Sequence, residues 1–165
     1  NRRALHEKLS LESEMIRRYQ KKGEKCFQMT ISFIDLDNFK NINDSFGHEA
    51  GDLVILKFAN LLRKVYRSID FISRFGGDEF VVFLPGVDDK QQVVTYVNNL
   101  VEMMRTRVIT PESANPVHGS IGIALYPKHA STYEELFKKA DEALYASKER
   151  GKDRYTFYIP KEVLK

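Results

Sequence analysis

Residues 71–84 read FISRFGGDEFVVFL, and this stretch decides how the middle of the chain folds. Two apolar runs flank the pair Gly76-Gly77. Such runs are typical of two strands joined by a tight turn, because glycine adopts the positive φ angles that tight turns need. We therefore predict a β-hairpin with Asp78 and Glu79 beside its turn.

A half-buried strand precedes the hairpin in the sequence. Phe27, Met29, Ile31 and Phe33 alternate with polar residues, which is the two-residue period of a strand, and the run ends at Asp35 and Asp37. After a short polar stretch, a helix is predicted to begin near Gly51-Asp52. Its buried stripe comprises Val54, Phe58, Leu61, Leu62 and Val65.

Capping residues and periodicity predict the other elements. Asp89 with Gln92, and Thr132 with Glu135, have the spacing of helix-capping pairs. We expect a helix at residues 3–22, a helix from Asp89 through Met104, a strand at 120–126, a helix from Thr132 to Gly151 and a strand at 155–158. The resulting β-α-β-β-α-β order predicts an α+β, ferredoxin-like fold, with an antiparallel sheet backed by helices.

The composition excludes several classes of protein. A chain of 165 residues with 42% hydrophobic residues suits one folded domain, and a net charge of +3 is too small to predict nucleic-acid binding. The single cysteine, Cys26, cannot form an internal disulfide, which favours a reduced compartment. No apolar stretch could span a bilayer, so we expect this fragment to make no membrane contact. We expect it to be cytoplasmic, alone or as the cytoplasmic part of a membrane-attached sensor.

Acidic residues gather at two predicted strand ends. Asp35 and Asp37 follow the first strand, and Asp78 and Glu79 follow the two glycines. Mg²⁺ is bound in proteins by one or two carboxylates, with substrate phosphates completing its shell. The pattern is compatible with a magnesium site, and equally with ordinary solubilising acids. No Walker loop, dinucleotide-binding glycine motif or zinc-ligand spacing is present.

The motifs around these acids resemble those of the GGDEF family of diguanylate cyclases. The resemblance extends from Asn1-Arg2 to about Tyr158. It comprises RFGGDEF at 74–80, DLDNFKNIND at 35–44, FGHEAGD at 46–52, SIGIA at 120–124 and ADEALY at 140–145, in the family's order.

The resemblance implies a reaction and a fold. Members of this family condense two GTP into cyclic di-GMP and release two pyrophosphates. Each domain holds one GTP, and two domains form an active homodimer. Their sheet is similar to the palm of nucleic-acid polymerases. The resemblance implies Mg²⁺ as cofactor, with Mn²⁺ as a substitute.

Family positions assign roles to individual residues. Asp35, Asp78 and the Leu36 carbonyl correspond to the metal ligands. Glu79 corresponds to a residue that binds metal or accepts the 3′-hydroxyl proton, and Lys40 to one that stabilises phosphate charge. The structural alternatives are a hairpin acid facing water and an exposed lysine.

Substrate-binding positions also match. Asn43 and Asp52 correspond to residues that read guanine, and His48 lies between them as a further substrate contact. Lys148 and Lys152 correspond to phosphate-binding residues, although the family usually has an arginine at the second position. Cations near a helix C-terminus are favourable in any protein, so a purely structural role stays open for both lysines.

Arg67 and Asp70 match the R-x-x-D inhibitory site of the family, at which product binds. An ordinary ion pair is the alternative at this spacing.

The resemblance also sets the expected domain limits. The domain is expected to span residues 1–158, without the family's usual first segment. Residues 159–165 would form a tail or a linker, in some relatives to an EAL phosphodiesterase domain. Two rival functions are a catalytically weak sensor of GTP or cyclic di-GMP and a structural dimerisation domain. The retained acids favour the enzyme.

Overall fold

The computed structural model describes residues 29–87, 89–108 and 115–161, together with Arg3, Glu7, Ser10, Leu11 and Glu14. The rest of the predicted helix at residues 3–22 lies outside this part of the chain. Within it, no helix has the length and apolar character needed to cross a membrane.

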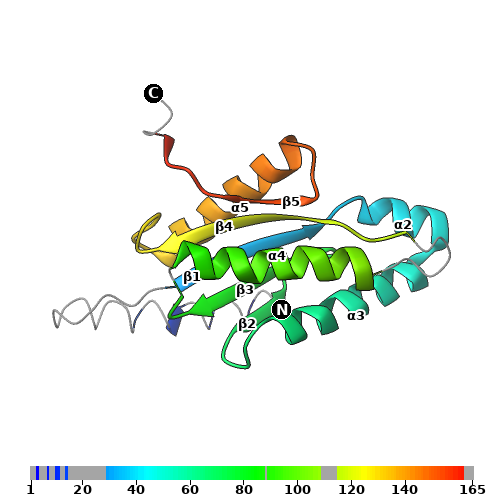
Figure 1. Ribbon diagram of the computed structural model, residues 1–165, viewed down its shortest axis with the longest axis horizontal. Helices are drawn as coiled ribbons and strands as arrows, with labels where there is room; N and C mark the ends of the chain where they lie inside the picture. Colours follow the sequence, from blue (N-terminus) through cyan, green and yellow to red (C-terminus); the bar gives the residue numbers. More distant parts are fainter. Residues whose placement is uncertain are drawn as a thin grey trace.

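A five-stranded sheet forms the centre of the molecule (Figure 1). Its strands are β1 (Met29–Leu36), β2 (Phe71–Arg74), β3 (Glu79–Pro85), β4 (Gly119–Tyr126) and β5 (Arg154–Phe157), in the spatial order β2-β3-β1-β4-β5. The pairs among the first four strands are antiparallel, as the β-α-β-β-α-β order predicts. Strand β5 pairs with β4 in parallel, so the complete sheet is mixed.

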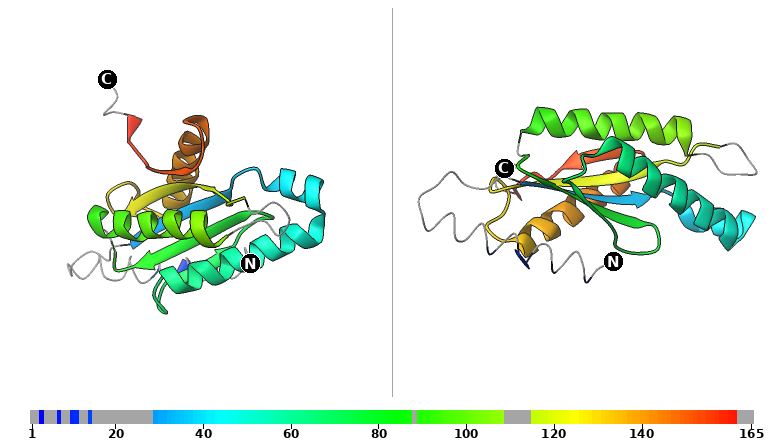
Figure 2. Two further views of the ribbon diagram at one scale, coloured as in Figure 1. Left: turned by 45° about the vertical axis from the view of Figure 1, so that its right-hand side comes forward. Right: turned by 90° about the horizontal axis from the view of Figure 1, so that it is seen from below.

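Helices cover both faces of the sheet. They are α2 (Phe39–Phe46), α3 (His48–Val65), α4 (Lys90–Arg107) and α5 (Tyr133–Glu149). Figure 2 shows α4 on one side of the sheet and α5 on the other. One core cluster contains residues of α3 and α4, and the other contains residues of α5. Alternate residues of β1 serve the two cores: Ile34 and Leu36 join the first, and Ile31 and Phe33 join the second.

The helix predicted to begin near Gly51 begins earlier. The polar stretch before it forms the separate helix α2, and α3 then starts at His48. Gly47, whose φ of 85° is accessible to glycine, lies between the two helices. The prediction missed α2 because its eight residues are mostly polar, although Phe39, Ile42 and Phe46 lie at helical spacing and Ile42 is buried.

The helices predicted from Asp89 and from Thr132 are confirmed as α4 and α5, with small differences at their caps. Asp89 caps α4 by accepting from the Gln91 N–H, whereas the sequence suggested a pair with Gln92. Thr132 caps α5 by accepting from the Glu135 N–H at 3.2 Å. The Glu135 carboxylate accepts from the backbone N–H and the hydroxyl of Ser131, one residue before the cap.

Helix α5 lies unusually close to the sheet. A Cβ added to Gly122 of β4 would collide with the Ala140 carbonyl and with the backbone N–H of Leu144. Since both obstacles are backbone atoms of one helix, no side-chain rotation could relieve the overlap. Gly122 therefore sets the distance between α5 and the sheet.

This close contact leads to a stability prediction. Gly122→Ala should lower the free energy of unfolding by about 2–3 kcal/mol or more, because α5 must move away from the sheet. Gly77→Ala is the matched control, since an added Cβ there meets nothing within 4 Å. Urea denaturation should show a lower midpoint for Gly122→Ala and an unchanged or slightly higher midpoint for Gly77→Ala. Equal midpoints for the two variants would show that the close contact between Gly122 and α5 does not restrict the residue at position 122.

Candidate active site

The pairing of β1 with both neighbours places the predicted acids at one end of the sheet. Asp35 lies opposite Glu79 of β3 and opposite Ser120 of β4. Directly opposed residues in antiparallel strands project from the same face, so Asp35 and Glu79 share the face covered by α5. Asp78 is adjacent, since its carbonyl accepts from the Leu36 N–H at 3.1 Å.

Asp35 is a buried carboxylate with a cationic partner. Its residue is 8% exposed, and its Oδ2 lies 2.7 Å from Nζ of Lys148, in the last turn of α5. Burial raises the pKa of Asp35, the Lys148 ammonium opposes that shift, and the charges of Asp78 and Asp37 add to it. The acids at this end of the sheet are therefore close enough to influence one another.

The donor set fits a hard divalent cation. Asp35 lies at the end of β1, the Asp78 charge acts on its carboxylate, and the Asp78 carbonyl accepts from the Leu36 N–H, so the oxygen donors that Mg²⁺ prefers lie near this end of the sheet. The described residues include no group of three or more His, Cys, Asp or Glu side chains arranged to hold a metal by themselves. A metal at Asp35 and Asp78 would therefore take further oxygens from the backbone, from water or from a bound substrate.

The turn between β2 and β3 does not use the predicted positive φ. Neither Gly76 nor Gly77 is among the glycines with φ in that region, so this part of the prediction is wrong. An added Cβ at Gly76 would overlap the end of the Glu79 carboxylate, so the glycine leaves room for the present position of that side chain. Arg74 steadies the turn, with Nη2 donating to the Gly77 carbonyl at 2.7 Å and Nε to the Gly76 carbonyl at 3.2 Å.

The two lysines predicted to bind phosphate approach this end of the sheet from the end of α5. Lys148 contacts Asp35, as described above. Lys152 lies in the turn that follows α5, and its Nζ donates to Oδ1 of Asn38 at 2.8 Å. Both ammonium groups therefore border the end of β1.

The predicted base-reading residues lie on the α2–α3 pair. The Asn43 amide rests against Gly51, where an added Cβ would overlap its Oδ1. Asp52 is the next residue along α3 and is exposed, as are His48 at the start of α3 and Lys40 in the first turn of α2. Asn43 therefore lies beside Gly51, the residue before Asp52. His48 and Lys40 lie on the outer surface of these helices.

A cavity of about 410 Å³ lies between α3 and the β2–β3 hairpin. Asp52 is the predicted site residue in its lining, and Arg74 and Phe80 line it from the hairpin. The acidic end of β1 is outside this lining. The cavity therefore lies beside Asp52 and does not include Asp35 in its lining.

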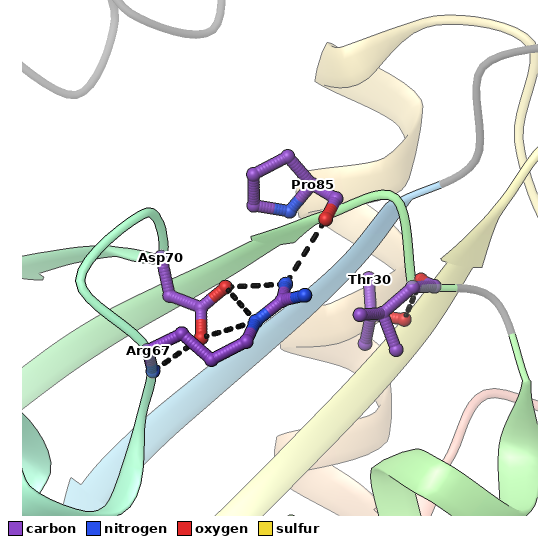
Figure 3. Close-up of polar contacts among 5 residues, drawn as sticks. Thr30, Arg67, Asp70 and Pro85 are labelled. Atoms are coloured by element: carbon purple, nitrogen blue, oxygen red, sulfur yellow. Dashed lines mark hydrogen bonds and ion pairs between the residues drawn. The ribbon is translucent and has the colours of Figure 1, made fainter.

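Arg67 and Asp70 form a well-defined ion pair (Figure 3). The Asp70 side chain is fully buried and accepts from Nε and Nη2 of Arg67 and, at 2.7 Å, from the Arg67 backbone N–H. Nη2 also donates to the Pro85 carbonyl at 3.0 Å. The Asp70 hydrogen bond raises the pKa of Arg67 further. The pair therefore has a structural role, whatever else it binds.

Sequence reasoning identified Asp37 but not the contacts that organise this region. Asp37 accepts hydrogen bonds from Ser120 and from the backbone of Asp153, and Asn38 accepts from Lys152. The Asp-x-Asp spacing pointed to Asp37 without indicating its partners. Nothing in the local sequence connects Asp153 with β1, because 116 residues separate it from Asp37.

The Lys148–Asp35 pair gives a prediction about pH. Lys148→Met should lower stability at neutral pH by about 1–3 kcal/mol, because a buried carboxylate loses its charged partner. Removing the ammonium raises the folded-state pKa of Asp35 further above its unfolded value. The loss of stability in Lys148→Met should therefore be present at pH values above the folded-state pKa of Asp35. It should fade as the pH falls toward the unfolded-state pKa of Asp35, which is about 4.

Urea denaturation at a series of pH values measures this difference. Lys138→Met, which removes an exposed lysine of the same helix, is the control. A Lys148→Met deficit that stays constant from neutral to acidic pH would contradict the assignment.

Comparison with known proteins identifies relatives of the whole fold. The family model for the diguanylate cyclase GGDEF domain matches residues 1–154. Diguanylate cyclase DgcP of Pseudomonas aeruginosa is 39% identical over 93% of this chain, and diguanylate cyclase A of Treponema denticola is 33% identical over 81%. This chain spans 22% and 36% of the lengths of those two relatives.

Solved structures agree with this relationship. The GGDEF domain of PA1120 (YfiN or TpbB) from Pseudomonas aeruginosa is 32% identical with a TM-score of 0.85, covering 98% of this chain and 97% of that one. The GGDEF domain of DgcB from Caulobacter crescentus, solved in complex with c-di-GMP, is 26% identical with a TM-score of 0.82, covering 96% and 90%. The chain belongs to the diguanylate cyclase GGDEF domain family.

Proposed function

We propose that this chain condenses two molecules of GTP into cyclic di-GMP. In each half of the reaction the 3′-hydroxyl oxygen of one GTP attacks the α-phosphorus of the other. A new O–P bond forms, the bond between the α-phosphorus and the bridging oxygen breaks, and pyrophosphate leaves. The hydroxyl proton passes to a base. Two such steps close the ring and release two pyrophosphates.

One observation carries this proposal: the strand register gathers Asp35, Asp78 and Glu79 at a single sheet end that also receives Lys148. Oxygen ligands beside a cation suit a metal-bound triphosphate, for which catalysis consists mainly of positioning and charge neutralisation. The relatives named as diguanylate cyclases support the same reaction.

We assign the individual roles as follows. Asp35, Asp78 and the Leu36 carbonyl would hold Mg²⁺, or Mn²⁺ in its place. Bound there, the metal would neutralise charge on the phosphate oxygens. Glu79, on the same face as Asp35, would accept the 3′-hydroxyl proton or assist the metal ligands.

Three lysines would hold the triphosphate. Lys148 would exchange its contact with Asp35 for a phosphate oxygen once the metal takes over that carboxylate. Lys152 would bind phosphate from the turn after α5, and Lys40 would stabilise charge on the transferring group. A lysine binds phosphate as a point charge, without the two-pronged geometry of arginine.

We assign guanine recognition to Asn43 and Asp52. An amide oxygen and a carboxylate accept hydrogen bonds from the N1–H and the exocyclic amine of guanine, groups that adenine does not present in that pattern. His48, at the start of α3, would be a further substrate contact. Equal rates of turnover for GTP and ATP would contradict this assignment.

The reaction requires two copies of the domain. Because each bound nucleotide supplies a hydroxyl to the other, two domains must meet face to face, and we propose a homodimer in the active state. The need for GTP and the single cysteine, which cannot form an internal disulfide, favour the cytoplasm. A domain that binds GTP or cyclic di-GMP as a sensor is the second candidate, and the retained Asp35, Asp78 and Glu79 favour the enzyme over it.

Removal of one proposed metal ligand should abolish the reaction. We expect Asp78→Asn to lower the rate of cyclic di-GMP formation by about a hundredfold or more, equivalent to about 3 kcal/mol of transition-state stabilisation. The assay incubates the protein with GTP and Mg²⁺ and separates the nucleotides by chromatography. Asp141→Asn, which changes an exposed acid of α5, should retain full activity.

Binding of GTP without product formation by the unmodified chain would favour the sensor. Comparable activity of Asp78→Asn and the unmodified chain would remove Asp78 from the site.

We also propose that cyclic di-GMP binds at Arg67 and Asp70 and slows its own synthesis. A guanidinium matches phosphate and guanine acceptors two at a time. To bind product, Arg67 would supplement or exchange its contacts with Asp70 and Pro85. The complex of the DgcB GGDEF domain with c-di-GMP shows that a related domain binds this molecule.

The buried Asp70 dictates which variant tests this idea. Arg67→Ala would strand a buried carboxylate and destabilise the fold, so Arg67→Lys is the better choice, because it retains the charge and loses the fork. Arg67→Lys should keep GTP turnover. It should raise the cyclic di-GMP concentration needed for half-maximal inhibition by about tenfold or more, which is equivalent to the loss of one charge-assisted hydrogen bond. Initial rates with added product measure it, and Arg63→Lys, on the last turn of α3, is the control. Superimposable inhibition curves would leave the pair with a structural role alone.

A further inference from the structure

The two aspartates at the end of β1 have different partners. Asp35 contacts a lysine side chain, whereas Asp37 contacts uncharged donors from two distant segments. We propose that Asp37 is a positioning residue and not a metal ligand. It holds the turn that carries Lys152 against the end of β1.

Both oxygens of the Asp37 carboxylate already accept a hydrogen bond from the protein. The Ser120 hydroxyl donates to Oδ1 at 2.6 Å, and the Asp153 N–H donates to Oδ2 at 2.8 Å. The Asp37 N–H donates to the His118 carbonyl at 2.9 Å, and the residue is 8% exposed. Each oxygen keeps a further lone pair, but these two bonds fix the orientation of the buried carboxylate, and turning it toward a cation would break them.

The turn after α5 has a conformation that needs such a restraint. Lys152 and Asp153 are consecutive residues with φ of 62° and 46°, in the left-handed region. That region is unfavourable by about 1–2 kcal/mol for a lysine, whereas aspartate adopts it more readily. Asp37 accepts its hydrogen bond from the backbone N–H of Asp153 itself, so the bond acts directly on this segment.

Further contacts show that the turn is fixed from several sides. The Asp153 carboxylate lies 2.8 Å from Nη2 of Arg105 at the end of α4, and 3.1 Å from Nδ1 of His118 just before β4, without the alignment of a hydrogen bond in the second case. Lys152 reaches Asn38, the residue that follows Asp37. Asp37 is the point at which β1, β4 and this turn meet.

The position of Lys152 depends on this arrangement. The Asp37–Asp153 bond holds the peptide that follows Lys152, and the Lys152 N–H donates to the Ser147 carbonyl at 3.1 Å. The Lys152 side chain points back to the end of β1. Only the claim that Lys152 then contacts a triphosphate rests on the function proposed above. The restraint of the turn by Asp37 does not.

Asparagine distinguishes a positioning role from a metal ligand. In Asp37→Asn, the amide oxygen can accept from the Asp153 N–H, and the amide nitrogen can donate to the Ser120 oxygen, since a hydroxyl both donates and accepts. The restraint is preserved while the charge is lost. A magnesium ligand would lose most of its affinity with that charge.

The first experiment is hydrogen–deuterium exchange on the nucleotide-free protein. In Asp37→Ala, exchange at residues 150–154 should be faster by about tenfold or more, equivalent to the loss of one hydrogen bond to a charged group, while α3 is unchanged. In Asp37→Asn, the same amides should stay within about threefold of the unmodified chain. If Asp37→Ala does not fold, Ser120→Ala serves instead and should show a smaller increase confined to the same turn.

The second experiment compares the response to magnesium. The Mg²⁺ concentration for half-maximal cyclic di-GMP synthesis should differ by less than about threefold between Asp37→Asn and the unmodified chain, and by about tenfold or more for Asp35→Asn. Where Asp37→Ala folds, it should raise KM for GTP more than it lowers kcat, because Lys152 is displaced.

Two results would overturn the proposal. One is an Asp37→Asn variant whose magnesium dependence matches that of Asp35→Asn. The other is unchanged exchange at residues 150–154 in Asp37→Ala or, where that variant does not fold, in Ser120→Ala. If the unmodified chain makes no cyclic di-GMP, the exchange experiment still decides the role of Asp37, because it requires neither nucleotide nor metal.

Discussion

Strand β1 pairs with β3 on one side and with β4 on the other, and the rest of the structure depends on the register of these two pairings. Its alternate residues fill both hydrophobic cores, so the register is fixed by burial along nearly the whole strand. A slip of one residue would exchange the two faces and carry Asp35 to the side of α3 and α4. The packing of the cores therefore also determines where the Asp35 carboxylate lies.

This arrangement concentrates negative charge where the surroundings resist it. Asp35 is buried near Asp78 and Asp37, and its raised pKa reflects both the burial and the neighbouring charges. The negative charge of the two buried aspartates is stabilised in different ways. Asp35 has the positive charge of Lys148, whereas Asp37 accepts hydrogen bonds from neutral donors.

Local sequence patterns anticipated most of the fold. Alternation in β1, the apolar runs around Gly76-Gly77 and the caps at Asp89 and Thr132 predicted the strands and helices that the structure has. Where prediction failed, tertiary contacts decided the outcome. Helix α2 carries Phe39, Ile42 and Phe46 at helical spacing, but it is short and Ile42 is its buried residue, and the prediction treated the segment as a polar stretch. The glycines of the hairpin were expected to provide positive φ, yet Gly76 provides space for the Glu79 side chain.

The sequence by itself determined which residues are available for chemistry, because the motifs around Asp35, Asp78 and Glu79 are contiguous and resemble those of one family. It also determined the order of strands and helices, since hydrophobic periodicity is a local property. Only the tertiary structure decided the partners: Lys148 for Asp35, and Ser120 and Asp153 for Asp37. These contacts join residues 83 to 116 positions apart. They exist because the sheet register and the turn after α5 bring the segments together, and no local pattern encodes a distance of that kind.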